Sequence, residues 1–173
     1  MAEYGAGSIR QLKGLESVRE RPGMYLGDPS NGDALHQCIR EVVDNAVDEN
    51  LAGYCTNIEV TLYPEDIVAV TDNGRGIPTA IHPEEGISAL QMVLGSLHAG
   101  AKFGHDAYAK SAGLHGVGVS AVNAVSQWLR ATVWRDGYEW KQSYTRGKPD
   151  ADVVRGKKTK DRGTEIRWLL NGL

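Results

Sequence analysis

Hydrophobic side chains recur at three- and four-residue spacing along one long stretch, residues 33–52. Its apolar positions are Leu35, Cys38, Ile39, Val42, Val43, Ala46 and Val47. Because a helix turns by about 100° per residue, this spacing gathers them on one face. The pattern predicts an amphipathic helix whose apolar face lies in the core and which ends at Gly53.

Shorter stretches, in which apolar residues alternate with polar ones or run together, predict strands. These stretches are residues 57–62, 67–71, 128–134, 138–144 and 164–169. The Pro-Glu-Asp segment at 64–66 suits a hairpin between the first two strands. An Asp-Gly pair at 136–137 suits a turn between the third and fourth.

Helical spacing of apolar residues predicts three further helices, at residues 8–19, 82–97 and 117–126. Ser8 could cap the first of them, and Pro22 with Gly23 would stop it. Residues 24–32 and the basic stretch 156–163 are expected to be loops.

The composition narrows the class of protein. The chain has 173 residues, of which 41% are hydrophobic, enough for the core of one domain or of a fragment of one. Its net charge of -3 does not indicate a basic surface that would bind nucleic acid. Any contact with DNA would therefore need segments outside this chain. Without an apolar signal segment or a membrane-spanning run, we expect a soluble, cytoplasmic protein with no membrane partner. Cys38 and Cys55 show no paired spacing and are expected to be reduced, buried thiols.

A polar stripe lies on the predicted long helix, beside its apolar face. Glu41, Asn45 and Asp48 follow one another by about one turn and point the same way. One interpretation is a solvated face, which most charged helix faces are. A chemical role is favoured by two other stretches: Asp72-Asn73-Gly74-Arg75-Gly76-Ile77-Pro78 directly after a strand, and the glycine-rich residues 98–118.

The glycine-rich stretch is too long for a plain connection and is typical of a lid or binding loop. It ends in Gly113-Leu114-His115-Gly116-Val117-Gly118 before a predicted helix, an arrangement in which backbone N–H groups can face a phosphate. A Rossmann interpretation fails because no buried strand precedes the glycines. A Walker A interpretation fails because no Gly-Lys-Ser/Thr closes them.

Together the three stretches contain what a nucleoside triphosphate needs. Asn45 can give an oxygen ligand to Mg²⁺, and Glu41 can accept a proton from a water that attacks the terminal phosphate. Asp72 can accept a hydrogen bond from an exocyclic amine, which favours adenine over guanine.

These motifs resemble those of a known superfamily. The segments that carry the resemblance are Glu41-Val42-Val43-Asp44-Asn45-Ala46, residues 72–78 and residues 113–118. They are similar to the successive ATP-binding motifs of the GHKL superfamily. Within it, Arg21-Pro22-Gly23-Met24-Tyr25, Leu97-His98-Ala99-Gly100 and residues 111–124 resemble the ATPase subunits of bacterial type II topoisomerases, the families of gyrase B and of its topoisomerase IV counterpart.

The resemblance implies a role for each matching position. Glu41 would be the general base, Asn45 the Mg²⁺ ligand and Asp72 the adenine acceptor. The other nucleotide contacts would be Gly76, Lys102, Tyr108, Leu114, His115, Gly116, Val117, Gly118 and Thr164. A neighbouring pocket for aminocoumarin antibiotics would be lined by Glu49, Arg75, Pro78 and Arg135, with Glu49 able to pair with Arg75. Residues 1–8, with Tyr4 and Ile9, would belong to an arm that is exchanged between subunits, and residues 98–118 would be the ATP lid.

Three positions depart from the family pattern. Gln37 stands where a histidine often precedes the catalytic glutamate by one turn, so it can hydrogen-bond that carboxylate but cannot share a proton with it. Ala101 and Ala112 stand where glycine pairs are usual, which predicts a stiffer lid.

The resemblance implies an α/β two-layer sandwich, a mixed sheet backed by helices (the GHKL or Bergerat fold), in one domain over residues 1–173. ATP and Mg²⁺ would lie between helix 33–52 and the lid. The family domain continues past Trp168, and a lysine of its next domain reaches the terminal phosphate. The chain would then be C-terminally truncated, and would bind ATP and aminocoumarin-type inhibitors with little turnover.

The parent protein would couple ATP binding to self-dimerisation and to passage of a DNA strand, with a gyrase A-type or topoisomerase IV A-type subunit and DNA held by other regions. Two alternatives stay open at this point. One is a chaperone or MutL-like mismatch-repair ATPase of the same superfamily. The other is a nucleotide-binding module that does not hydrolyse ATP.

Overall fold

A computed structural model describes residues 14–28, 32–97 and 118–170. A seven-stranded sheet runs through it in the order β1-β2-β7-β3-β4-β5, with β6 paired to β4. The strands are β1 (Ile58–Tyr63), β2 (Ile67–Asp72), β3 (Ser126–Arg135), β4 (Tyr138–Thr145), β5 (Lys148–Pro149), β6 (Val154–Lys158) and β7 (Gly163–Leu170). Every pairing among these strands is antiparallel, although their order in the sheet departs from their order in the chain.

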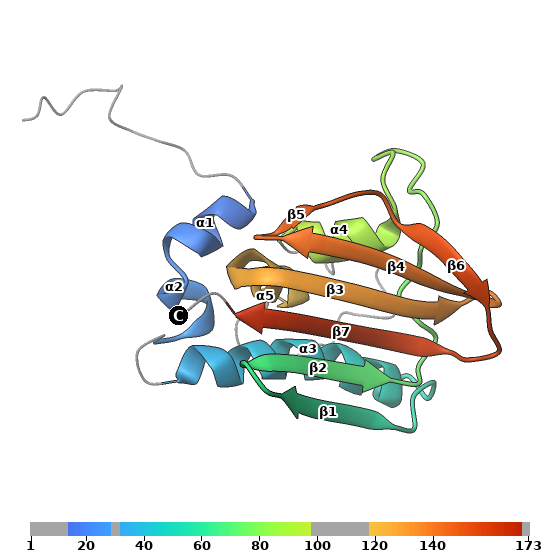
Figure 1. Ribbon diagram of the computed structural model, residues 1–173, viewed down its shortest axis with the longest axis horizontal. Helices are drawn as coiled ribbons and strands as arrows, with labels where there is room; N and C mark the ends of the chain where they lie inside the picture. Colours follow the sequence, from blue (N-terminus) through green and yellow to red (C-terminus); the bar gives the residue numbers. More distant parts are fainter. Residues whose placement is uncertain (1–13, 29–31, 98–117, 171–173) are drawn as a thin grey trace, which may run out of the picture.

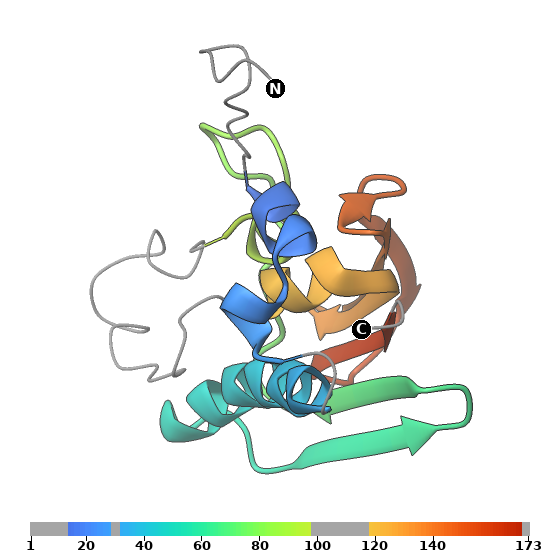
Figure 2. The same ribbon diagram turned by 90° about the vertical axis from the view of Figure 1, so that its left-hand side faces the viewer.

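The helices lie on one side of the sheet (Figures 1 and 2). They are α1 (Leu15–Glu20), α2 (Gly23–Leu26), α3 (Asp33–Leu51), α4 (Ala89–Gly95) and α5 (Gly118–Val125). The structure thus confirms the two-layer α/β class. None of the helices in the described part of the chain has both the length and the apolar character needed to cross a membrane.

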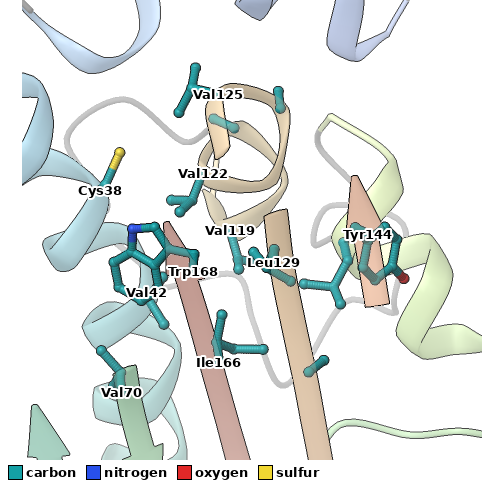
Figure 3. Close-up of a cluster of buried hydrophobic side chains, with 14 of the residues drawn as sticks. Cys38, Val42, Val70, Val119, Val122, Val125, Leu129, Tyr144, Ile166 and Trp168 are labelled. Atoms are coloured by element: carbon teal, nitrogen blue, oxygen red, sulfur yellow. The ribbon is translucent and has the colours of Figure 1, made fainter. Parts of the chain in front are cut away.

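The core fills the space between the helices and the sheet (Figure 3). Trp168 of β7 is fully buried and lies between α3, which contributes Cys38 and Val42, and Val122 of α5. Both cysteines are buried free thiols, and burial together with the charge of Glu41 raises the pKa of Cys38 to about 12. The apolar face of the long helix and the inward positions of the central strands therefore meet as predicted.

The five predicted strands and the long helix are confirmed to within a residue or two. The helix predicted at 117–126 is α5, which passes directly into β3 at Ser126. Of the helix predicted at 8–19, the structure describes residues 14–20, where α1 ends at Glu20. The Pro-Glu-Asp hairpin carries its turn at Glu65 and Asp66, which both have positive φ.

Three local predictions are wrong. Residues 24–32 are not all loop, because Pro22 occupies the N-cap position of the short helix α2, and proline suits the start of a helix. The helix predicted at 82–97 begins only at Ala89, since Gly86 has φ of 69° and Ser88 caps the helix by accepting from the Gln91 N–H. The stretch 156–163 is not all loop, because β6 runs to Lys158.

Candidate nucleotide-binding site

The buried carboxylate of Glu41 lies where α3 meets α5. Gln37, one turn earlier on α3, donates its Nε2 to Glu41 Oε1 at 2.7 Å. The backbone N–H of Gly118, the first residue of α5, donates to Glu41 Oε2 at 2.9 Å. The predicted hydrogen bond from Gln37 is confirmed, and the carboxylate is held in one orientation by two donors that do not titrate.

Asp72, which carries a second carboxylate, is the last residue of β2 and pairs directly with Thr164 of β7. The Gly74 N–H donates to Asp72 Oδ1 at 2.7 Å, and the Thr164 backbone also hydrogen-bonds the carboxylate. Burial, with a contribution from the charge of Glu49, nevertheless raises the pKa of Asp72 above its ordinary value. The Thr164 hydroxyl accepts from the Ile77 N–H at 3.2 Å, so β7 holds the loop that follows Asp72.

Two glycines allow the backbone to come this close. Gly76 has φ of 78°, and a Cβ there would lie 3.0 Å from the carbonyl oxygens of Gly163 and Trp134. Gly163 has φ of 134°, and a Cβ there would collide with the carbonyl oxygen of Asp72. L-residues with a side chain rarely adopt such angles, so both positions require glycine.

Glu49, near the end of α3, binds the loop after Asp72 through Arg75. The Arg75 side chain contacts the Glu49 carboxylate through Nη2 at 2.7 Å and Nε at 3.1 Å, and its backbone N–H donates at 3.0 Å. The Arg75 guanidinium also stacks on the Tyr54 ring, 3.9 Å from the centroid. Burial alone would raise the pKa of Glu49, but the hydrogen bonds and charge of Arg75 outweigh it and lower that pKa.

The other residues predicted for the neighbouring pocket belong to the same loop region. Arg135, at the end of β3, donates from Nη1 to the Gly76 carbonyl oxygen at 2.7 Å. Pro78 follows in the loop and is exposed. The structure thus brings Arg75 and Arg135 to the loop 73–78, on either side of Gly76.

The two carboxylate clusters are separated along one rigid element. Glu41 and Glu49 are eight positions apart on α3, which corresponds to about 12 Å of helix rise. Glu49 fixes the loop beside Asp72, whereas Glu41 contacts the start of α5. The arrangement suits an elongated ligand with a hydrogen-bond donor at one end and charged groups at the other.

A family comparison agrees with this geometry. Residues 30–171 match the model of the histidine kinase-, DNA gyrase B- and HSP90-like ATPases. The chain belongs to this ATPase family.

Relatives within this ATPase family cover almost all of the chain. It is 53% identical to the DNA gyrase B subunit of Rickettsia conorii over 97% of its length. It is 54% identical to the DNA gyrase B subunit of Treponema pallidum over 96% of its length, and 56% identical to that of Thermotoga maritima over 97%. The chain spans only 21 to 26% of the length of these relatives.

ATP and Mg²⁺, the nucleotide and ion that membership of this ATPase family implies, fit the residues present. Asn45 is exposed and donates its Nδ2 to the Glu41 carbonyl oxygen at 3.3 Å, which leaves the side-chain oxygen as the available ligand atom. Among the described residues, no three His, Cys, Asp or Glu side chains gather into a metal-holding group. An ion at Asn45 would therefore be held by one amide oxygen, waters and phosphates, as Mg²⁺ commonly is in nucleotide sites.

Part of the predicted ATPase site lies outside the described residues. This part comprises Lys102, Tyr108, Leu114, His115, Gly116 and Val117, together with Ala101, Ala112 and the arm at residues 1–8. Of the glycine-rich motif, only Gly118 is described, and its φ is 66°.

Sequence reasoning missed two features of the site. It did not predict that the Gly118 N–H would bind Glu41, which depends on how α5 packs against α3. It did not single out Gly163, although an isolated glycine at the start of a predicted strand is a signal of close backbone approach.

Proposed function

We propose that this chain is the ATP-binding part of a gyrase B-like bacterial type II topoisomerase. The observation that carries the proposal is the identity of 53 to 56% with gyrase B subunits across nearly the whole chain. Eight relatives of 52 to 56% identity carry that name, which favours it over a chaperone or a mismatch-repair ATPase.

In this proposal each cluster binds one end of the nucleotide. Asp72 accepts a hydrogen bond from the adenine amine, with Thr164 and Gly76 beside it. Bound ATP supplies the phosphoanhydride that is cleaved, and Mg²⁺ neutralises phosphate charge. Asn45 gives an oxygen to the ion, and Gly118 with the residues before it contacts the phosphates. Glu41 orients the attacking water and takes its proton at a carboxylate oxygen.

The orientation of Glu41 supports its role as base. Both of its oxygens accept hydrogen bonds, from Gln37 and from Gly118. Because both donors are neutral and fixed, the carboxylate keeps its direction when a water binds.

For the whole protein, we propose that ATP binding closes a dimer and that hydrolysis reopens it, which drives DNA strand passage with a gyrase A-type subunit. The net charge of -3 supports the view that other regions hold the DNA. We also propose that Glu49, Arg75, Pro78 and Arg135 line an aminocoumarin site next to the adenine.

Competition between ligands tests the proposal. A fluorescent, non-hydrolysable ATP analogue should bind the chain and be displaced by an aminocoumarin. Arg75→Ala should weaken aminocoumarin binding by at least about tenfold while ATP-analogue binding persists, since one charge-assisted hydrogen bond is worth about 1.5 to 3 kcal/mol. Lys157→Ala, an exposed cation on β6, serves as the control. Failure of the aminocoumarin to displace the analogue would contradict the gyrase-like assignment.

A further inference from the structure

The face of the sheet opposite the helices carries two arginines that oppose each other. Arg130 of β3 and Arg167 of β7 are direct cross-strand partners, and none of the helices α1 to α5 covers this face (Figure 1). Within the described part of the chain, neither makes an ion pair. Like charges directly opposite on neighbouring strands destabilise a sheet, and no ion pair within the described residues offsets this cost.

Each guanidinium is nevertheless held in place. Arg130 stacks on the Trp128 ring, with its Cζ 4.7 Å from the centroid. Arg167 stacks on the Tyr63 ring at 4.2 Å. The Nε of Arg167 is buried and has no hydrogen-bond partner among the described residues. A buried donor without an acceptor is costly, and because this Nε is shielded from solvent, an incoming group would reach it only if the Arg167 side chain moved.

An apolar row lies beside the arginine pair on the same face. Trp128 pairs with Leu169, Leu169 with Ile67, and Ile67 with Tyr63, across four neighbouring strands. Tyr63 is 38% exposed, and the other three are partly buried. The face therefore combines an unsatisfied cationic pair with a strip of aromatic and aliphatic side chains.

We propose that this sheet face docks a protein segment that places an Asp or Glu carboxylate between Arg130 and Arg167 and lays apolar side chains on the neighbouring row. A carboxylate matches the planar guanidinium and can satisfy both arginines at once. Aromatic side chains and arginine are also the residues enriched in protein–protein interfaces.

A nucleic acid fits this face less well. The stacked guanidiniums already cover one side of the Trp128 and Tyr63 rings, and base stacking needs free ring faces. Glu165, two positions before Arg167 on the same face of β7, and Glu59, in the same row across β2, lie in the next row on this face. They would repel a strand that carries successive phosphates more than a single carboxylate placed between the two arginines.

The test uses the whole chain and a short synthetic peptide that alternates glutamate with leucine. Binding is followed by NMR at the Trp128 indole N–H and the Tyr63 ring. We expect these signals to shift on titration, and Arg130→Glu to weaken binding by at least about tenfold. Lys160→Glu makes the same charge change at an exposed loop position and should leave the affinity within about twofold.

Two further readouts make the outcome decisive. Without any peptide, Arg130→Glu should raise the melting temperature, because it converts a like-charge pair into an opposite-charge pair. A lower melting temperature would contradict the proposal. So would equal binding of a peptide with glutamine in place of glutamate, tighter binding of single-stranded oligothymidylate, or no shift at Trp128 with any probe.

Discussion

At the scale of single residues, the proposed catalytic role of Glu41 depends on how its carboxylate is held. Gln37 and Gly118 both donate to Glu41, and neither can change protonation state in the physiological range. The position of Gln37 one turn before Glu41 could be predicted from helical spacing alone. The contact with Gly118 could not, because it joins residues 77 positions apart through the packing of two helices.

Gln37→Glu tests this arrangement through stability rather than turnover. It places a second carboxylate against Glu41, which raises the pKa of the pair in the folded state. The penalty, about 1 to 3 kcal/mol in the free energy of unfolding, should be present at neutral pH. It should disappear as the pH falls through the raised folded pKa, when the pair takes up a proton.

Gln37→Met is the matched control, since it removes the donor without adding a charge. Its stability difference from the wild type should vary less with pH than that of Gln37→Glu, because no second carboxylate is added. Denaturant unfolding at several pH values measures both variants. A penalty for Gln37→Glu that is the same at neutral and acid pH would contradict the contact.

The ion pair between Glu49 and Arg75 has the opposite pH dependence. The folded-state pKa of Glu49 lies below its ordinary value of 4.5. Its contribution to stability is therefore complete above that ordinary value and is lost as the pH falls through the lowered folded pKa. We expect Glu49→Gln to cost about 1 kcal/mol at neutral pH, with the difference shrinking in acid. If the loss of unfolding free energy caused by Glu49→Gln grew as the pH fell, the lowered pKa of Glu49 would be contradicted.

At the scale of elements, caps and close backbone contacts decide where helices and strands begin. Ser88 accepts from the Gln91 N–H at 3.1 Å and starts α4 seven residues later than periodicity suggested. Before it, Pro83 and the acidic pair Glu84-Glu85 are typical of a helix start, but Gly86 has positive φ and Ile81 bridges to Ser88. The local hydrophobic pattern thus predicted the helix α4 correctly, but not the residue at which it begins.

Ser88→Ala should destabilise the chain by about 1 kcal/mol, because the Gln91 N–H loses its acceptor. Ser96→Ala is the control, since Ser96 follows the end of the same helix and offers no side-chain cap. The melting temperatures of the two variants are compared by thermal unfolding. Equal melting temperatures would mean that the cap does not stabilise α4.

Gly163→Ala tests the junction of β2 and β7. The new Cβ would collide with the Asp72 carbonyl oxygen at a φ that disfavours side chains, so we expect a loss of more than about 3 kcal/mol. Gly95→Ala is the control, because Gly95 lies in α4 and a methyl group there would meet nothing within 4 Å. It should be neutral or slightly stabilising. Similar stability of the two variants in denaturant unfolding would contradict the close approach.

The arrangement of strands was only partly predictable. Five strands followed from their hydrophobic patterns, but β5 and β6 did not, because all of their residues are exposed and β6 contains two adjacent lysines. The pairing of Asp72 with Thr164 joins residues that are 92 positions apart in the chain. Such pairing depends on the order of strands in the sheet, which a local pattern does not contain.

At the scale of the whole molecule, one helix joins the two ends of the site. α3 carries Glu41 towards α5 and Glu49 towards the loop after Asp72, about 12 Å apart along its axis. Because both ends are fixed to one element, the clusters proposed to bind the base and the phosphates keep a set distance. The central claim is that this distance is occupied by ATP, with Asp72 as the acceptor for adenine.

Calorimetric titration with a non-hydrolysable ATP analogue and Mg²⁺ tests that claim most directly. The wild type should bind, and Asp72→Asn should lose at least about tenfold in affinity, because the amide at that position no longer offers two acceptor oxygens. Asp66→Asn makes the same change at the exposed hairpin turn and should bind like the wild type. Undiminished binding by a folded Asp72→Asn variant, or equal binding of a GTP analogue by the wild type, would contradict the account.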